Sequence, residues 1–417
     1  MSPNLRIALR FLFARKRSML MSLAGIVFGV GIFIVTQAQT SGFEEFFIKT
    51  ILGTNGAIRV EDKFQDTLRA INAGGSGSSS RFQVSDRDNR RYIEGVENPR
   101  LVREALSQFP NVAAVSEIVS GSALAKSPLR DDSAQILGIN LEDHLQASDL
   151  ETQIILGDLD EFRTDLIGAL IGVDLAERLQ VSVGDAITLS TSAGGNRRFR
   201  IDAVFQTGSR DIDKIRLFVH MSEARSLLNR PFGASYLQIN LLDRDRAPMD
   251  ALHMESVLQH SVTSWQEREE VWLDVFLALQ VSSALTVSTI ILISGLGMFN
   301  TLAMMVMEKT REISILRSMG YTRKDISRIF IWLGVIVLAI GTVTGWLVGA
   351  GLTFGVSHLP IRIRGIFSTD HFVVHVSVWH YVTAAVTAAI IVMIASLIPA
   401  RRAARLEPGD VIRGTAT

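Results

Sequence analysis

Among the residues of this chain, three histidines near the C-terminus come closest to having the spacing of metal ligands. His371, His375 and His380 are near one another, and the first two would share a helix face if that segment were helical. Zinc sites usually add cysteine or well-spaced carboxylates. The 417 residues contain no cysteine, and no such carboxylate accompanies the histidines. We therefore predict no metal site and interpret them as polar residues at the margin of a hydrophobic segment.

Two carboxylates, Asp211 and Asp213, are one residue apart and could act as a general acid and base. Alternate strand residues face the same side of a sheet, so we expect both to be solvated on a strand. The sequence has no Gly-x-Ser-x-Gly nucleophile motif and no phosphate loop, and the dipeptide Gly-Lys is absent. The sequence therefore predicts a chain that is not an enzyme, with no catalytic residue and no cofactor. If ATP and Mg²⁺ power it, they bind to another chain.

The segment from Met307 to Gly320 is short and highly charged, and it interrupts an otherwise apolar C-terminal third. Glu308 and Glu312 near its start and Arg317 near its end suit the dipole of a helix. Gly320 favours a left-handed helix stop. We predict a short helix here.

An apolar stripe runs beside these charges, formed by Ile313, Leu316 and Met319 with Ile315 adjoining. Two interpretations remain open on physical grounds. The helix could lie on a lipid surface, or it could insert into the groove of a cytosolic partner. Just beyond it, Thr322–Asp325 has the Thr-x-x-acid pattern that begins a new helix.

Four apolar runs must position these residues: Ser18–Phe43, Val275–Met307, Ile329–Ile361 and Phe372–Ala400. Each exceeds the roughly 20 residues that a helix needs to cross about 30 Å of hydrocarbon. The mean hydropathy of +0.27 averages these runs with ordinary soluble sequence. The predicted fold class is an α-helical membrane protein with four transmembrane helices. Its 42 basic and 42 acidic residues balance, which argues against nucleic acid as a partner.

Basic residues place both termini in the cytoplasm by the positive-inside rule. A cluster precedes the first run, an excess follows the second, and more arginines follow the fourth. A cleaved signal peptide is the alternative at the N-terminus, because Thr36-Gln37-Ala38 resembles a cleavage site, but the apolar region is too long for one. The basic residues are Arg6, Arg10, Arg15, Lys16 and Arg17; Lys309, Arg311, Arg317, Arg323, Lys324 and Arg328; and Arg401, Arg402, Arg405 and Arg413.

The region from Glu44 to Glu270 has soluble composition, and this orientation predicts a large extracytoplasmic α+β domain with two subdomains between helices 1 and 2. We expect a flexible loop at Asn72–Ser80. We also expect Ser261–Trp272 to be a helix continuous with the second span, with Trp265 and Trp272 as interfacial anchors. The predicted strands are Ala57–Val60, Ala113–Val119, Ala134–Ile139, Ala186–Thr191, Phe199–Phe205, Arg216–His220 and Tyr236–Leu241, and the helices are Pro99–Gln108, Val173–Leu179 and Ser222–Leu228.

Small residues on two of the spans predict close helix packing. Gly25 and Gly29 are four residues apart on the first span, and Gly341, Gly345 and Gly349 repeat this spacing on the third. The expected division of the chain is a cytoplasmic N-terminus with helix 1 (1–43), a periplasmic domain (44–270), helix 2 (271–306), a cytoplasmic coupling segment (307–327), helix 3 (328–357), a periplasmic loop (358–377), helix 4 (378–400) and a cytoplasmic tail (401–417).

Two segments carry a family resemblance. Met305–Ile326 resembles the signature of the macrolide-exporter-type ABC permease superfamily, which includes the lipoprotein-releasing and cell-division permeases. Ile398–Pro408 resembles the C-terminal signature of the same superfamily. The motifs most similar to the lipoprotein-releasing permeases are Gly42–Glu44, Ile136–Ile139, Gly172–Ala176, Val183–Asp185 and Trp265–Arg268.

The resemblance implies a permease subunit in a bacterial inner membrane that pairs with a second, identical or homologous permease. A cytosolic ABC ATPase dimer would bind the charged helix as a coupling helix and move the periplasmic domain. A lipoprotein would leave the membrane lipid between the first two spans and pass to a periplasmic carrier. The coupling residues would be Glu308, Lys309, Arg311, Glu312, Ile315, Leu316, Arg317 and Gly320, and the substrate would meet Phe28, Ile32, Val275 and Leu279.

One segment departs from the family pattern. Between Leu189 and Phe199 the chain has only a short polar turn, whereas the carrier-recruiting permease has a longer protruding loop there. The chain could therefore be the partner-type subunit, which does not recruit the carrier, or a homodimer with another substrate. Two alternatives to lipoprotein release stay open: a mechanotransmission permease that regulates a periplasmic enzyme, and an efflux permease that works with an outer-membrane duct.

Overall fold

The computed structural model describes residues 3–14, 16–62, 95–192, 194–360, 363–364, 368–369 and 372–405. The predictions for Asn72–Ser80 and His371 lie outside these residues. The chain divides into two compact units: a helical unit of Met1–Glu45, Asp274–Ile361 and Asp370–Thr417, and a mixed unit of Phe46–Leu273 and Arg362–Thr369.

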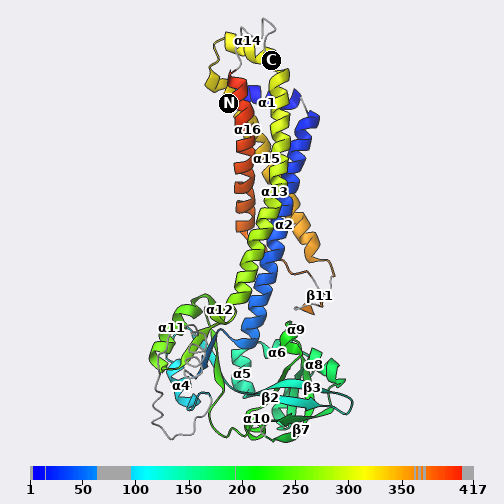
Figure 1. The fold of residues 1–417 in the computed structure, drawn as a ribbon, viewed down its shortest axis with the longest axis vertical. Coiled ribbons are helices and arrows are strands. Elements are labelled where there is room, and N and C mark those ends of the chain that lie inside the picture. The colour runs from blue at the N-terminus through cyan, green and yellow to red at the C-terminus, as the bar shows by residue number, and fades with distance from the viewer. Residues whose placement is uncertain are drawn as a thin grey trace, which may run out of the picture. The chain divides into compact units, whose positions relative to one another are not determined.

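The helical unit is built on four long helices, each apolar and long enough to cross a membrane: α2 (Lys16–Asn55), α13 (Glu270–Glu308), α15 (Arg323–Ser357) and α16 (Val378–Arg405). Figure 1 shows them side by side in this unit, with the short helix α1 (Pro3–Ala14) against α15 and α14 (Thr310–Ser318) joining α13 to α15. The predicted fold class is confirmed. Helix α2 continues past the predicted end at Phe43, because a helix needs no apolar run once it leaves the hydrocarbon.

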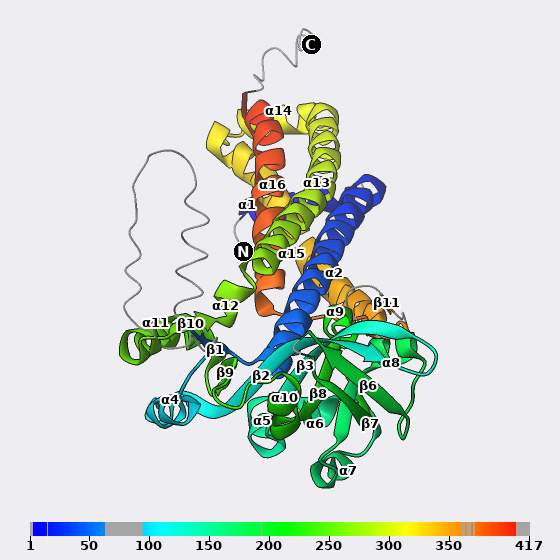
Figure 2. The same cartoon turned by 60° about the horizontal axis from the view of Figure 1, so that its bottom comes forward.

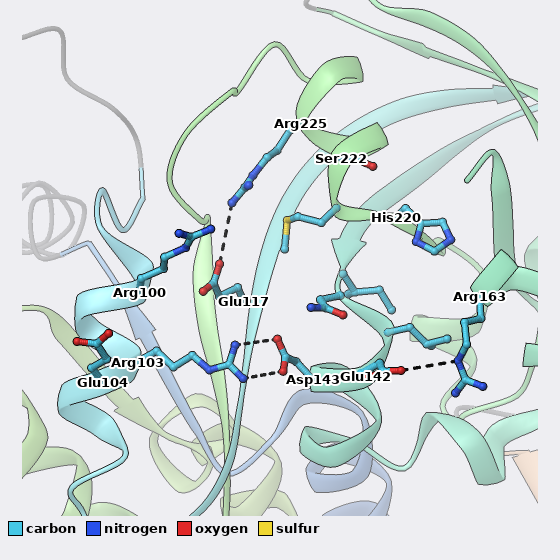
Figure 3. A pocket seen from close by; sticks show the side chains of 14 residues that line it. Arg100, Arg103, Glu104, Glu117, Glu142, Asp143, Arg163, His220, Ser222 and Arg225 are labelled. Atoms are coloured by element: carbon cyan, nitrogen blue, oxygen red, sulfur yellow. Dashed lines mark hydrogen bonds and ion pairs between the residues drawn. The ribbon is translucent and has the colours of Figure 1, made fainter. Parts of the chain in front are cut away.

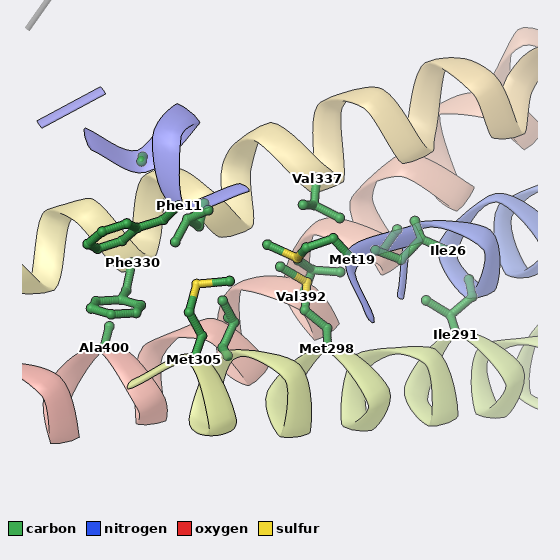
Figure 4. Packing of buried hydrophobic residues seen from close by; sticks show 14 of the residues in the cluster. Phe11, Met19, Ile26, Ile291, Met298, Met305, Phe330, Val337, Val392 and Ala400 are labelled. Atoms are coloured by element: carbon green, nitrogen blue, oxygen red, sulfur yellow. The ribbon is translucent and has the colours of Figure 1, made fainter. Parts of the chain in front are cut away.

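Buried side chains from all four long helices and from α1 and α14 interdigitate in the core of the helical unit. Figure 4 shows Met19 and Ile26 of α2 with Met298 and Met305 of α13 in this core. The ring of Phe11 on α1 packs beside Phe330 of α15, with 6.4 Å between the ring centroids.

Glycines allow α2 to approach two neighbours in this core. A Cβ at Gly25 would lie 2.8 Å from Ser294 Oγ of α13, and one at Gly29 would lie 2.8 Å from Ile291 Cγ1. A Cβ on Gly341, Gly345 or Gly349 would lie 2.8, 2.8 or 3.0 Å from Ile26, Val30 or Ile34 of α2. The first pair of glycines therefore faces α13, and the stripe on α15 faces α2.

The mixed unit has a ten-stranded sheet in the order β10-β1-β9-β2-β3-β8-β5-β7-β4, with β6 paired to β2 and β7 (Figure 2). The β3–β8 and β5–β7 pairs are parallel, and the other pairs are antiparallel. The strands are β1 (Ile58–Glu61), β2 (Val112–Lys126), β3 (Asp131–Ile139), β4 (Ile154–Gly157), β5 (Gly168–Gly172), β6 (Ala186–Thr191), β7 (Asn196–Phe205), β8 (Arg216–His220), β9 (Tyr236–Leu241) and β10 (Ser261–Ser264).

Short helices cover this sheet, and a separate hairpin of β11 (Ile363–Arg364) and β12 (Ser368–Thr369) also belongs to the unit. The helices are α4 (Pro99–Leu106), α5 (Leu141–Ala147), α6 (Leu150–Gln153), α7 (Leu159–Thr164), α8 (Val173–Leu179), α9 (Arg210–Asp213), α10 (Met221–Leu227), the 3₁₀ turn η1 (Arg244–Arg246), α11 (Ala247–Leu258) and α12 (Trp265–Arg268).

Two predictions about this region are wrong. Ser261–Ser264 is strand β10, paired with β1, rather than helix, and the chain turns through α12 before α13 begins. Trp265 is buried in the core of the mixed unit, where its Nε1 donates to the Arg244 carbonyl at 3.1 Å. The sequence predicted this indole at the lipid interface. The closely packed core and the hydrogen-bond acceptor hold it inside the mixed unit instead. Trp272 packs its ring against Phe47.

The carboxylates Asp211 and Asp213 are also placed differently from the prediction. They lie on the helical turn α9, so they are not alternate residues of a strand. Asp211 is exposed and pairs with Lys214, whereas Asp213 is fully buried. The two carboxylates therefore have unlike surroundings and do not form a catalytic pair.

Candidate functional site

The charged segment singled out in the sequence forms α14, set off from its neighbours by a break at each end. Lys309 leaves helical geometry after α13, while its N–H still donates to the Met305 carbonyl at 2.9 Å. At the other end Gly320 has φ +100°, a conformation that glycine adopts at little cost. The Tyr321 N–H returns to the Leu316 carbonyl at 3.2 Å, which closes the helix end.

Helix α15 then begins with the capping box predicted at Thr322 and Asp325. Thr322 Oγ1 accepts from the Asp325 N–H at 3.3 Å, and Asp325 Oδ2 accepts from the Thr322 N–H at 3.1 Å. Reciprocal caps of this kind satisfy donors that a helix start leaves free. Two defined ends therefore hold α14 as a separate element at a fixed place between α13 and α15.

The inward face of α14 packs against the core of the helical unit. Ile313 and Ser314 are buried, and the half-buried Leu316 contacts the same core. Arg317 reaches toward the end of α16, where its Nη1 donates to the Ala404 carbonyl at 3.5 Å. A movement of α14 would therefore pull on the membrane helices directly.

The outward face of α14 combines charge with exposed apolar surface. Arg311 and Glu312 are exposed, and Ile315 and Met319, one turn apart, are 51% and 74% exposed. Glu308 at the end of α13 is exposed as well. The predicted stripe is thus divided, because Ile313 and Leu316 face the core while Ile315 and Met319 face outward.

Lys309 is tied to its own unit. Its ammonium forms an ion pair with Glu312 and lies 5.8 Å from the centroid of the Phe11 ring. An exposed ion pair of this type contributes little stability, about 0–1 kcal/mol. It does orient Glu312 and link α14 to α1.

The four residues expected to meet a substrate lie on α2 and α13. Phe28, Val275 and Leu279 are 60%, 42% and 52% exposed, whereas Ile32 is half-buried against the core of the helical unit. Helix α13 buries the smallest share of its apolar stretch among the four long helices. Three of the four side chains are therefore available to lipid or to another chain.

Polar contacts that the sequence did not indicate link α2 to its neighbours within the helical unit. Gln280 of α13 donates to the Glu44 carboxylate. Ser41 bonds Nε2 of His380 at 3.0 Å, and the His375 N–H donates to the Ala38 carbonyl at 2.9 Å. Two of the histidines considered as metal ligands thus take part in helix contacts.

The last turn of α2 is anchored in the mixed unit by side chains from the sheet. Arg216 Nη2 donates to Asn55 Oδ1 at 3.0 Å, and Gln238 Nε2 donates to the Thr54 carbonyl at 3.4 Å. Just past the helix, Arg268 Nη2 donates to the Gly56 carbonyl at 2.8 Å. Carbonyls at a helix end lack partners within the helix, and here Gln238 of β9 supplies one for Thr54 and Arg268 of α12 supplies one for Gly56.

Burial perturbs the ionisation of the two anchoring arginines and of Asp213. Desolvation lowers the pKa of Arg268 to about 10 and lowers that of Arg216. Desolvation raises the pKa of Asp213 to about 6, although Thr207 Oγ1 donates to Asp213 Oδ1 at 2.7 Å. The loop that carries Thr207 continues to Gly208, where a Cβ would lie 3.1 Å from the Phe46 ring of α2.

A charged cavity of about 730 Å³ opens in the mixed unit, and Figure 3 shows its labelled side chains. Arg103 of α4 holds Asp143 of α5 through two hydrogen bonds of 2.7 and 2.6 Å. Arg225 and Arg163 lie 4.0 Å from Glu117 and Glu142, respectively. The cavity is lined by Arg100, Arg103, Glu104, Glu117, Ile139, Asn140, Leu141, Glu142, Asp143, Arg163, His220, Met221, Ser222 and Arg225.

These arginine–carboxylate pairs neutralise much of the charge of the cavity. The hydrogen bond to Asp143 raises the pKa of Arg103 further, so the guanidinium stays charged. His220 Nε2 contacts the Phe162 carbonyl at 2.6 Å, and its ring stacks on the Phe162 ring. The cavity is therefore lined largely by paired charges, which suit it to polar contact.

Two family descriptions match the chain. A MacB-like periplasmic core domain matches residues 19–255, which is more than half of the chain, and an FtsX-like permease C-terminal segment matches residues 284–408. The chain belongs to the ABC transporter permeases of the FtsX and MacB type. The resemblance noted for Met305–Ile326 and Ile398–Pro408 is thereby confirmed, and the second match includes α14.

Three relatives of this permease extend over most of its length. The lipoprotein-releasing system transmembrane protein LolC of Xylella fastidiosa is 25% identical, over 98% of both chains. LolE of Haemophilus influenzae is 24% identical, over 94% of this chain and 93% of the relative. The macrolide export ATP-binding/permease protein MacB of Psychrobacter cryohalolentis is 24% identical, over 98% of this chain but only 59% of the relative. The sequence identity of this chain to these relatives is thus nearly equal, although their names state different roles.

Proposed function

We propose that this permease converts ATP hydrolysis by a separate cytosolic ATPase dimer into motion of its periplasmic domain, and that the ATPase binds the outward face of α14. The observation that carries the proposal is the division of α14 into two faces. Its inner face joins the helix to the core through Ile313 and Leu316, while its outer face exposes Ile315 and Met319 among charges. A helix that is fixed on one side and exposed on the other suits helix-in-groove recognition.

The absence of a phosphate loop from the printed sequence favours an ATPase on a separate chain. ATP and Mg²⁺ would therefore bind the partner and not this chain.

The predicted coupling residues have different tasks in this arrangement. Glu308, Arg311, Glu312 and Ile315 would contact the ATPase, and Met319 joins them because it is exposed beside Ile315. Leu316 and Arg317 would transmit force to the core and to α16. Lys309 orients Glu312, and Gly320 fixes the helix end.

Substitutions on the two faces of α14 test this assignment. Burying an isoleucine side chain in a partner groove contributes about 1.5–3 kcal/mol. Ile315→Glu is therefore expected to weaken ATPase binding about 10-fold to 150-fold while leaving the thermal unfolding of the permease nearly unchanged. Leu316→Ala is the contrasting control, because it should lower the unfolding temperature and leave the affinity of the folded protein for the ATPase intact. Normal copurification and ATPase stimulation by Ile315→Glu would refute the coupling assignment.

We also propose that the permease spans a bacterial inner membrane with both termini in the cytoplasm, and that it pairs with a second permease, identical or homologous. The exposure of α13 supports the pairing, because Val275 and Leu279 leave apolar surface for a partner or lipid. These residues, with Phe28 and Ile32, are proposed to meet the substrate. A photo-crosslinker at Phe28 or Leu279 that never captures an acylated substrate would count against this path.

Lipoprotein release to a periplasmic carrier is the proposed activity, supported by similarity to LolC and LolE over nearly the whole chain. The turn between β6 and β7 is short, and its Thr191 N–H donates to the Gly195 carbonyl at 2.9 Å, so carrier recruitment is assigned to the partner permease. Acylated lipoprotein that copurifies without ATP and is released when ATP is added would support this activity.

Regulation of a periplasmic enzyme by mechanotransmission is the second candidate. The anchoring of Thr54 and Asn55 by sheet side chains, and of Gly56 by Arg268 of α12, favours it, since force along α2 would reach the sheet without any transported molecule. Efflux through an outer-membrane duct is a third candidate, suggested by the MacB relative alone. A periplasmic hydrolase whose activity follows ATP turnover by the reconstituted complex, with no acylated cargo bound, would favour the second candidate over release.

A further inference from the structure

Strand β4 at one end of the sheet exposes apolar residues where an edge strand is usually protected. Its sequence is Ile154-Ile155-Leu156-Gly157, and Ile155 and Leu156 are 45% and 60% exposed. Natural sheets commonly protect such edges with charged side chains, proline or a covering helix. The described residues place neither another strand nor a proline on the outer side of β4. The edge is therefore open to pairing with an added strand.

The register of β4 gives this edge only partial protection. β4 pairs with β7 in a register that shifts between Ile154 and Leu156, so Leu156 lies opposite Val204 and Gly157 opposite Ala203. Such an irregularity shortens the regular edge without covering it. At the opposite end of the sheet, Ser261, Val262 and Ser264 of β10 are buried, so the two edges of the same sheet differ.

The surroundings of β4 are acidic. Asp158, Asp160, Glu161 and Asp165 follow it on α7 and the adjoining turns, and Asp158 accepts from the Asp160 N–H at 3.0 Å. The nearby guanidinium groups are already engaged. Arg163 pairs with Asp160 at 2.7 Å, and Arg200 contacts Asp165 at 3.2 Å and Asp202 at 2.9 Å. The open edge thus lies beside a surplus of carboxylates.

We propose that β4 is a docking edge for an extended segment of a periplasmic protein that alternates β-branched apolar residues with lysine or arginine. Main-chain hydrogen bonds to β4 would supply much of the affinity, as in other cases of strand addition. The carboxylates of α7 would select a basic segment. A second copy of this permease is a poor occupant, because two-fold antiparallel pairing would bring one acidic α7 near the other. This docking does not depend on ATP coupling through α14.

Synthetic peptides test the proposal on the full-length permease in lipid nanodiscs. The probe is Lys-Val-Thr-Val-Lys-Val-Thr with a fluorescent label, read by anisotropy and by amide hydrogen exchange. We expect it to bind and to slow exchange at Ile154–Gly157, with no change at β10. The same peptide with glutamate in place of lysine should bind about 10-fold more weakly or worse, and alternate N-methylation should abolish binding.

A variant that places charged side chains on β4 tests the same proposal from the side of the permease. Ile155→Lys/Leu156→Lys replaces two exposed side chains, so it should fold, and it should lose peptide binding by placing like charges at the edge. Leu129→Lys is the control, because Leu129 is 70% exposed on the β2–β3 turn, and this variant should bind normally. Equal binding of the basic and acidic peptides, or unchanged binding to the double variant, would overturn the proposal. Dissociation of a permease oligomer by the double variant would instead identify a second copy as the occupant and would also overturn it.

Discussion

The junction between α2 and the sheet can be tested by removing a single acceptor, with Asn55→Ala. Arg216 is buried, and its Nη2 donates to Asn55 Oδ1 at 3.0 Å, while its Nε already has no hydrogen-bond partner among the described residues. The alanine variant takes away that acceptor from a desolvated cation. Hydrogen bonds to charged groups contribute about 1.5–3 kcal/mol, so we expect a loss of about that size in the free energy of unfolding.

The same substitution should separate ATP turnover from work in the periplasm. α14 is untouched, so ATPase binding and stimulation should stay near the wild-type level, whereas cargo release or enzyme activation should fall. Asn55→Asp is the matched variant, because it keeps an acceptor and places a carboxylate opposite the guanidinium. It should therefore recover both stability and coupling.

The assay measures thermal unfolding, the ATPase rate and the output on the same preparation of the purified complex. Output here means cargo release or enzyme activation. Asn55→Ala with wild-type stability and wild-type output would show that the Arg216 contact is dispensable. A parallel fall of ATPase rate and output would equally refute the reasoning, since it would place the defect before the junction. Only a selective loss of output per ATP, reversed in Asn55→Asp, agrees with a mechanical junction at the end of α2.

Two further predictions concern packing and ionisation. Gly345→Leu should lower the unfolding temperature and the yield of folded protein, because even its Cβ would lie 2.8 Å from two atoms of Val30. Overpacking of this kind typically costs about 1–3 kcal/mol. Gly351→Leu on the same helix is the control, since nothing lies within 4 Å of its Cβ. Burial raises the pKa of Asp213 from 3.8 to about 6, so its ionisation should destabilise the fold increasingly as pH rises from about 4 to above 6, by up to about 3 kcal/mol. Asp213→Asn keeps an acceptor for Thr207 and should unfold at a higher temperature than wild type at pH 7 but not at pH 4, and a constant difference across this range would contradict the assigned ionisation.

Much of the membrane part could be predicted from the sequence because its signals are local. An apolar run long enough to span a bilayer has few alternatives, and the stop at Gly320 and the cap at Thr322 each depend on residues within one turn. Three strands of the ten-stranded sheet, β4, β5 and β10, were missed for the opposite reason. Their identity as strands comes from partners distant in the chain.

The errors at individual residues have the same origin. Asp213 was expected in solvent, but Thr207 and the loop beside α2 bury it. Trp265 was expected at lipid, but the core of the mixed unit encloses it. In both cases a tertiary contact overrides a preference that holds for the residue type on average. The Arg216–Asn55 contact was not predicted at all, because no local pattern relates residues 161 positions apart.

The two faces of α14 show what the structure adds to the motif. From the sequence, Ile313, Ile315, Leu316 and Met319 form one apolar stripe, and a lipid-surface helix would bury them together. In the structure the stripe is shared between the core and the outside, and the exposed pair is interleaved with Arg311 and Glu312. A helix lying on lipid would need its apolar side chains on the lipid face and its charges on the other. The mixed outer face therefore fits a protein groove better than a bilayer surface, and it makes Ile315 rather than the core-facing Leu316 the residue whose substitution tests docking.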